Sequence, residues 1–162
     1  MSSVTSQLFK TEELVNESKD QYTWKISEPD RIKSIKILIV EDYIPLRNML
    51  IKALEYDGFI KIVTTSDGEE AVAVAKEFKP DVVIMDHSLE KMNGLEATKL
   101  IKAENPDAVV IALSGLPSPT LILDYLRAGA FSFASKPIRL ENLLYQVRRA
   151  VDKIKPPANA TV

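Results

Sequence analysis

Hydrophobic residues along the chain gather into five short runs that are separated by segments with a helical period. The runs cover residues 35–40, 60–63, 82–85, 109–113 and 131–134, and the first is rich in β-branched residues. They are largely continuous and do not alternate strictly with polar residues, which is typical of strands covered on both faces in a parallel sheet. The pattern therefore predicts five buried parallel strands.

After the strand runs come segments whose apolar residues recur every three or four positions. Behind the first run, Leu46, Leu50 and Leu54 lie on one face of a predicted helix, and Pro45 suits its first turn. Later helices are predicted around residues 71–78, 95–101, 121–128 and 140–154. Strands and helices thus alternate along the chain, as they do in α/β proteins.

The helix starts carry capping signals. Ser66 followed by Glu69 is a capping-box sequence before the helix at 71–78, and Ser118 is placed to cap the helix at 121–128. Right-handed crossovers between successive strands place such helices on both faces of the sheet. We therefore predict a doubly wound five-stranded parallel α/β sheet.

Composition restricts the function classes. The 162 residues include 21 Lys and Arg against 23 Asp and Glu, a formal charge of −2, without a basic cluster, which argues against nucleic acid as a partner. The sequence has no Cys, so it offers no disulfide, thiolate ligand or thiol nucleophile. Its longest purely apolar stretch, residues 108–113, is too short to cross a membrane, and its start does not resemble a secretory signal. We therefore expect a cytoplasmic protein.

The chain divides into three parts by composition. Residues 1–33 are polar with no sustained period and are interpreted as an N-terminal extension that is flexible or loosely docked. Residues 34–155 form the predicted domain. Residues 156–162, which begin with two prolines, form a C-terminal tail.

Polar residues capable of chemistry stand where four of the predicted strands end. They are Glu41 and Asp42 after the first strand, Asp86 after the third, Ser114 after the fourth and Lys136 after the fifth. The carboxyl ends of parallel strands share one edge, and ligands bind there at the point where the strand order reverses. Each residue alone has an ordinary explanation as a cap, turn former or solvated charge, so only their joint placement predicts a site.

The chemistry of this set favours a metal ion and a phosphoryl group. Carboxylates packed together repel each other unless a cation lies between them, and oxygen ligands alone favour Mg²⁺. Lys136 would add a point charge and Ser114 a hydrogen bond for a phosphoryl oxygen. Asp86 is then the candidate acceptor, since a carboxylate can take a phosphoryl group as an acyl phosphate.

Six ordered motifs carry a family resemblance over residues 36–155. They are ILIVEDY, SDGEEAV, DVVIMD, KMNGLE, ALSG and GAFSFASKP. Together they resemble the response-regulator receiver domain of two-component signalling, in particular its stand-alone, chemotaxis-regulator-like form. The resemblance implies a flavodoxin-like fold with strand order 2-1-3-4-5.

Residue by residue, the resemblance implies a phosphorylation site. Asp86 corresponds to the phosphoacceptor and Lys136 to the lysine that pairs with the phosphoryl group. Asp42 would bind Mg²⁺ directly, Glu41 mostly through water, and Ser88 through its backbone carbonyl.

The resemblance also implies a conformational switch. Ser114 would move toward the phosphoryl oxygen, and Phe133 would turn inward into the vacated space. The peptide bond between Lys136 and Pro137 is typically cis in this family, a geometry that only an X-Pro bond adopts readily.

As a member of this family, the chain would receive its phosphoryl group from a histidine kinase or a phosphotransfer protein. Its only reactions would be self-phosphorylation and autodephosphorylation. Eight residues follow Ile154, too few for an output domain, so we expect a downstream target protein in trans unless the sequence is a fragment of a larger protein. The chain could also pair with a second copy of itself.

The residues around Asp86 differ from the family pattern, and two rival interpretations of the function remain. Glu90 stands where the family often has Pro. His87, the only His, stands next to Asp86, and an incidental packed or exposed side chain is favoured over a role as phosphodonor or metal ligand. A pseudo-receiver that serves only as an interaction module is one rival. An aspartyl-phosphate hydrolase of the haloacid-dehalogenase type is the other, but its general acid would occupy the position of Ser88.

Overall fold

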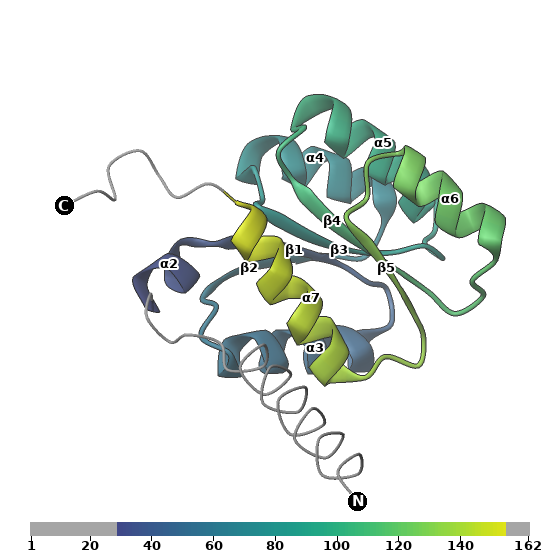
Figure 1. Cartoon of the computed structure of the whole chain (residues 1–162). Coiled ribbons are helices and arrows are strands. Elements are labelled where there is room, and N and C mark those ends of the chain that lie inside the picture. The colour runs from purple at the N-terminus through teal and green to yellow at the C-terminus, as the bar shows by residue number, and fades with distance from the viewer. Residues whose placement is uncertain (1–28, 155–162) are drawn as a thin grey trace, which may run out of the picture.

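The structure is a computed structural model that describes residues 29–154 (Figure 1). Its elements, in chain order, are α2 (Pro29–Ser34), β1 (Lys36–Val40), α3 (Ile44–Tyr56), β2 (Lys61–Thr65), α4 (Gly68–Phe78), β3 (Val82–Asp86), α5 (Gly94–Glu104), β4 (Val109–Ser114), α6 (Pro119–Arg127), β5 (Ser132–Ser135) and α7 (Leu140–Lys153). All five predicted strands and the five helices that follow them are present. Within the described range, no helix is both long and apolar enough for a membrane span.

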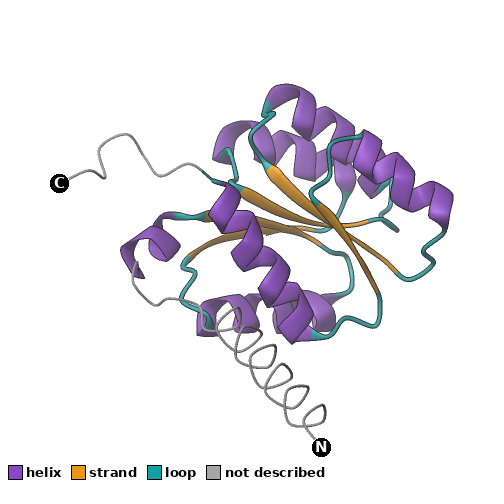
Figure 2. Cartoon of the chain, in the orientation of Figure 1, coloured by secondary structure: helices purple, strands orange, loops and turns teal. Residues whose placement is uncertain are grey.

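The strands form one parallel sheet in the order β2-β1-β3-β4-β5. Figure 2 shows the sheet in the middle of the domain with helices on both sides. The register places Val40 beside both Thr65 and Met85, and Ser114 beside Ser135. The predicted doubly wound, flavodoxin-like fold is confirmed, and the order reverses between β1 and β3.

Alternate residues of each central strand supply two separate cores. Ile37 and Ile39 of β1 face α3 and α7, whereas Leu38 and Val40 face α4, α5 and α6. All four side chains are fully buried. Burial on both faces explains why β1 and β3 appear in the sequence as unbroken apolar runs.

The N-terminal side of the domain differs from the prediction. No regular element was expected before Ser34, but residues 29–34 form the helix α2, which is too short to show a period in the sequence. The Arg31 guanidinium donates hydrogen bonds to the carbonyls of Val151 and Ile154 at 2.9 and 2.7 Å, and Ile32 packs on the α3–α7 core. The interpretations made for residues 1–28 and 156–162 lie outside the described residues, and the domain boundaries stay predictions.

The helix caps were predicted with mixed success. Ser118 caps α6, because its hydroxyl accepts a hydrogen bond from the Leu121 amide at 3.1 Å. The predicted box of Ser66 and Glu69 is wrong by one residue, since α4 is capped by Asp67, which accepts from the amide of Glu70 at 2.8 Å. Both Ser and Asp are strong caps, so the sequence alone did not decide between neighbours.

Gly94, the first residue of α5, lies against the end of β3. A Cβ atom there would overlap the backbone carbonyl of Asp86 and lie 2.7 Å from the Tyr125 hydroxyl oxygen. We expect Gly94→Ala to lower the free energy of unfolding by about 1–3 kcal/mol, because backbone must shift to admit the methyl group. Urea denaturation measures this, with Gly115→Ala as the matched control, since a Cβ at Gly115 meets nothing within 4 Å. Equal stability of the two variants would contradict the packing argument.

Candidate functional site

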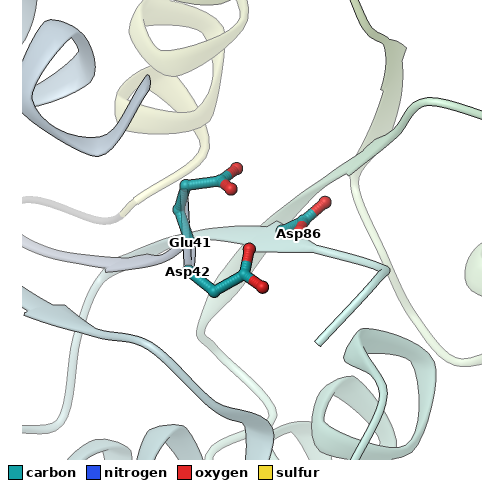
Figure 3. Close-up of side chains that lie close together, drawn as sticks. All are labelled: Glu41, Asp42 and Asp86. Carbon is teal, nitrogen blue, oxygen red and sulfur yellow. The ribbon is translucent and has the colours of Figure 1, made fainter. Parts of the chain in front are cut away.

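Three carboxylates meet where β1 and β3 end (Figure 3). Glu41 and Asp42 directly follow β1, and Asp86 is the last residue of the neighbouring strand β3. One oxygen atom of each lies within 4.8 Å of the others. Glu41 and Asp86 are buried and Asp42 is exposed, so the cluster opens to solvent on the side of Asp42.

Lys136 joins this cluster from the residue after β5. Its Nζ donates a hydrogen bond to Glu41 Oε2 at 2.9 Å and lies 2.9 Å from Asp86 Oδ1 as an ion pair. Both distances are short, so a single ammonium group is shared between the two buried carboxylates.

Burial and charge shift two pKa values in this cluster. Burial raises the pKa of Glu41; the hydrogen bond from Lys136 acts in the opposite direction, and the charge of Asp86 adds to the rise. Burial acts to lower the pKa of Lys136, but its contacts with Glu41 and Asp86 outweigh burial and raise that pKa. One ammonium thus faces two buried carboxylates, which leaves an excess of negative charge when all three groups are ionised, and the exposed carboxylate of Asp42 adds to that excess.

The donor set fits a hard divalent cation. All of its side-chain ligands are oxygens, without His or Cys, and Mg²⁺ favours one or two carboxylates together with water and phosphate oxygens. Ser88 lies on the exposed turn after β3, two residues beyond Asp86. The part predicted for its backbone carbonyl stays a prediction.

Ser114 ends β4, the strand beside β3, and Phe133 lies on β5, the next strand out at the edge of the sheet. The buried Ser114 hydroxyl accepts a hydrogen bond from the Leu116 amide at 3.2 Å, which ties it to the following loop. Phe133 pairs with Ala112 across β4 and β5 and is partly buried. The Lys136–Pro137 peptide bond is cis, as the resemblance implied.

The loop that follows Asp86 is fastened to the start of α4. Lys91 Nζ lies 3.1 Å from Asp67 Oδ2, and Gly68 allows the Met92 backbone to approach closely. The amide of Glu70 and the ammonium of Lys91 lower the pKa of Asp67. The sequence did not reveal this bridge, because residues 67 and 91 stand in different strand–helix units.

A second contact was also missed. His87 Nδ1 lies 3.0 Å from the hydroxyl of Tyr125, a fully buried residue of α6. The available signal was a tyrosine among the aliphatic residues of the α6 segment, whose hydroxyl needs a partner once buried. His87 is therefore partly buried, and its ring is within hydrogen-bond distance of the Tyr125 hydroxyl.

Residues 37–148 match the response regulator receiver domain family. The chain belongs to this family. It is 33% identical over 116 residues to the chemotaxis protein CheY of Listeria monocytogenes, which covers 72% of this chain and 98% of that protein. The crystal structure of the response regulator domain of Thermotoga maritima CheB superposes with a TM-score of 0.67 at 33% identity, over 75% of this chain and 98% of that one.

A second solved structure is also similar to this chain. The crystal structure of a CheY-like receiver domain protein from Methanospirillum hungatei matches with a TM-score of 0.71 at 25% identity, over 74% of this chain and 96% of that one. The chain is thus a receiver domain of the CheY-like type, a phosphorylatable signalling module that is generally not an enzyme. Such domains bind Mg²⁺ at an acidic cluster, which corresponds here to the group around Glu41.

Proposed function

We propose that this chain is a phosphorylation-activated receiver that accepts a phosphoryl group on Asp86 and signals by contact with a separate target protein. The donor would be a phosphohistidine on a histidine kinase or a phosphotransfer protein. The observation that carries the proposal is the buried Asp86 carboxylate, whose Oδ1 lies 2.9 Å from Nζ of Lys136 and which forms one cluster with two more carboxylates.

The transfer step makes one bond and breaks one. A carboxylate oxygen of Asp86 attacks phosphorus, the P–N bond to the donor imidazole breaks, and the imidazole leaves with its electron pair and takes a proton. Lys136 offsets negative charge on the transferred group and remains paired with Glu41. When bound, Mg²⁺ would neutralise phosphoryl oxygens and be held by Asp42, Glu41 and Asp86.

The two rival functions have less support. A hydrolase of the haloacid-dehalogenase type would need a second Asp as general acid two residues after the nucleophile, and Ser88 occupies that position. A pseudo-receiver would have lost part of the acceptor site, whereas here the acceptor, lysine and acidic groups lie together. Glu90, exposed on the loop after β3, does not enter that cluster.

The donor class can be tested directly. We expect a phosphotransfer protein phosphorylated on histidine to pass its phosphoryl group to this chain in the presence of Mg²⁺, followed by gel separation of the labelled proteins. The control is the same donor with its histidine replaced by glutamine. Transfer from neither kinases nor phosphotransfer proteins would argue for an interaction module instead.

We expect Ser114→Ala to separate phosphorylation from signalling. The variant should still accept phosphate, because the hydroxyl is not a phosphoacceptor, but it loses the bond through which the loop at Gly115 would respond. A charge-assisted hydrogen bond contributes about 1.5–3 kcal/mol, enough to make a minor conformer dominant. Hydrogen exchange of α6 and β5 with and without beryllofluoride measures the response. A response equal to that of wild type would assign the switch to another contact.

A further inference from the structure

Among the residues that the structure describes, Tyr125 is the largest fully buried side chain that carries a polar group, and its hydroxyl reaches the residue that follows β3. It stands on α6, and its hydroxyl lies 3.0 Å from Nδ1 of His87, the residue directly after Asp86. Either tautomer of a neutral imidazole can make this bond, as acceptor or as donor. Among the described contacts it is the one side-chain link between the residue next to the acceptor and α6.

The rings around this bond are closely packed. Tyr125 meets the His87 ring edge to face at a centroid distance of 5.7 Å and the Phe133 ring at 5.6 Å. Gly94 leaves the space that the Tyr125 hydroxyl fills, since a Cβ there would lie 2.7 Å from that oxygen. The hydroxyl therefore sits among β3, α5 and β5, and a movement of any of them changes its surroundings.

The bond makes the positions of two elements depend on each other. If the end of β3 moved while α6 stayed in place, the Tyr125 hydroxyl would be left buried without a partner, which is unfavourable. The bond is kept when the end of β3 and α6 move together, and it is also kept when neither of them moves. Such a penalty on mixed arrangements is a coupling between the two sites.

We propose that Tyr125 is a positioning residue that couples the state of Asp86 to α6 through His87, in addition to any route through Ser114. This inference rests on the proposed function, because it assumes that Asp86 is the phosphorylated residue. Phe133 would respond together with Tyr125, since the two rings are in contact. The hydroxyl, more than the ring, carries the coupling.

The test removes the hydroxyl and keeps the ring. Wild type, Tyr125→Phe, His87→Phe and the double variant are saturated with beryllofluoride and Mg²⁺, and fluorine NMR reports the bound probe. Amide hydrogen exchange then gives the response of α6. The matched control is Tyr56→Phe, which removes a hydroxyl from a tyrosine that is 95% exposed.

We expect all variants to bind the probe, with a response in α6 that is about 2- to 10-fold smaller in Tyr125→Phe, the range for loss of one hydrogen bond. Tyr56→Phe should respond like wild type. In the His87→Phe background, Tyr125→Phe should add nothing, because the partner of the hydroxyl is already gone. A merely structural role would instead lower the free energy of unfolding of Tyr125→Phe while the α6 response of the folded, probe-saturated protein stays at the wild-type level.

Two outcomes would overturn the inference in different ways. Full binding of the probe with an unchanged α6 response in Tyr125→Phe, or additive effects of the two substitutions, would reject the coupling and leave the proposed function intact. Absence of the bound-probe signal in wild type would reject the proposed function and this inference with it. Urea denaturation of each variant establishes that the measured protein is folded.

Discussion

We expect that replacing Asp86 with asparagine abolishes phosphorylation of the chain. The amide lacks the carboxylate oxygen that forms the acyl phosphate, while Lys136 and the two remaining carboxylates stay in place. Among the described contacts, Lys136 forms ion pairs with Glu41 and Asp86 but not with the exposed Asp42. Treatment of the phosphorylated protein with borohydride, which reduces an acyl phosphate to an alcohol, and peptide mass mapping should locate the modified residue at position 86.

The matched control for this substitution is Asp107→Asn. Asp107 is an exposed aspartate that precedes β4, at the opposite end of the strands from the acidic cluster. The Asp107→Asn variant should be phosphorylated at position 86 to the same extent as the wild-type protein. Modification that persists in Asp86→Asn at the wild-type level, with reduction at another residue, would refute the assignment of the acceptor.

Removing the carboxylate of Asp42 should weaken Mg²⁺ binding more than any other change outside Asp86. Asp42 is the exposed member of the acidic cluster, so it lies where a hydrated cation enters from solvent. Loss of a residue that only supports a metal ligand typically costs roughly 10- to 100-fold in affinity, and loss of a ligand should cost at least as much. Phosphorylation of Asp42→Ala should slow accordingly, because phosphoryl oxygens then approach uncompensated carboxylates.

Titration calorimetry of Asp42→Ala with MgCl₂ measures this effect. The control is Glu90→Ala, which removes a negative charge from the exposed loop after β3 without touching the acidic cluster. Its affinity should fall far less than that of Asp42→Ala, since charges exposed to solvent are screened. Equal Mg²⁺ affinity in Asp42→Ala and wild type would show that the cation binds elsewhere.

The sheet and the acidic cluster were predictable because both follow from local patterns and one topological rule. Strands buried on both faces appear as apolar runs, and parallel strands bring their carboxyl ends to one edge. Glu41, Asp86 and Lys136 stand directly at strand ends, so their meeting required only the strand order. The roles assigned to them are still predictions, which the substitutions above test.

Contacts between side chains of different units were not predictable in the same way. Two examples are the bond between His87 and Tyr125 and the bridge between Asp67 and Lys91. Both depend on the position of each helix relative to the sheet. Sequence periodicity gives the face of a helix that is buried but not the partner of a particular atom. The helix α2 was missed for another reason, since its six residues are too few to show a period.

Intact mass spectrometry after incubation with acetyl phosphate tests the central claim most directly. Wild type with Mg²⁺ should gain the mass of one phosphoryl group, whereas wild type with EDTA and Asp86→Asn with Mg²⁺ should gain none. A gain of mass in Asp86→Asn equal to that of wild type, or none in wild type with Mg²⁺, would contradict the account of this chain as a receiver phosphorylated at Asp86.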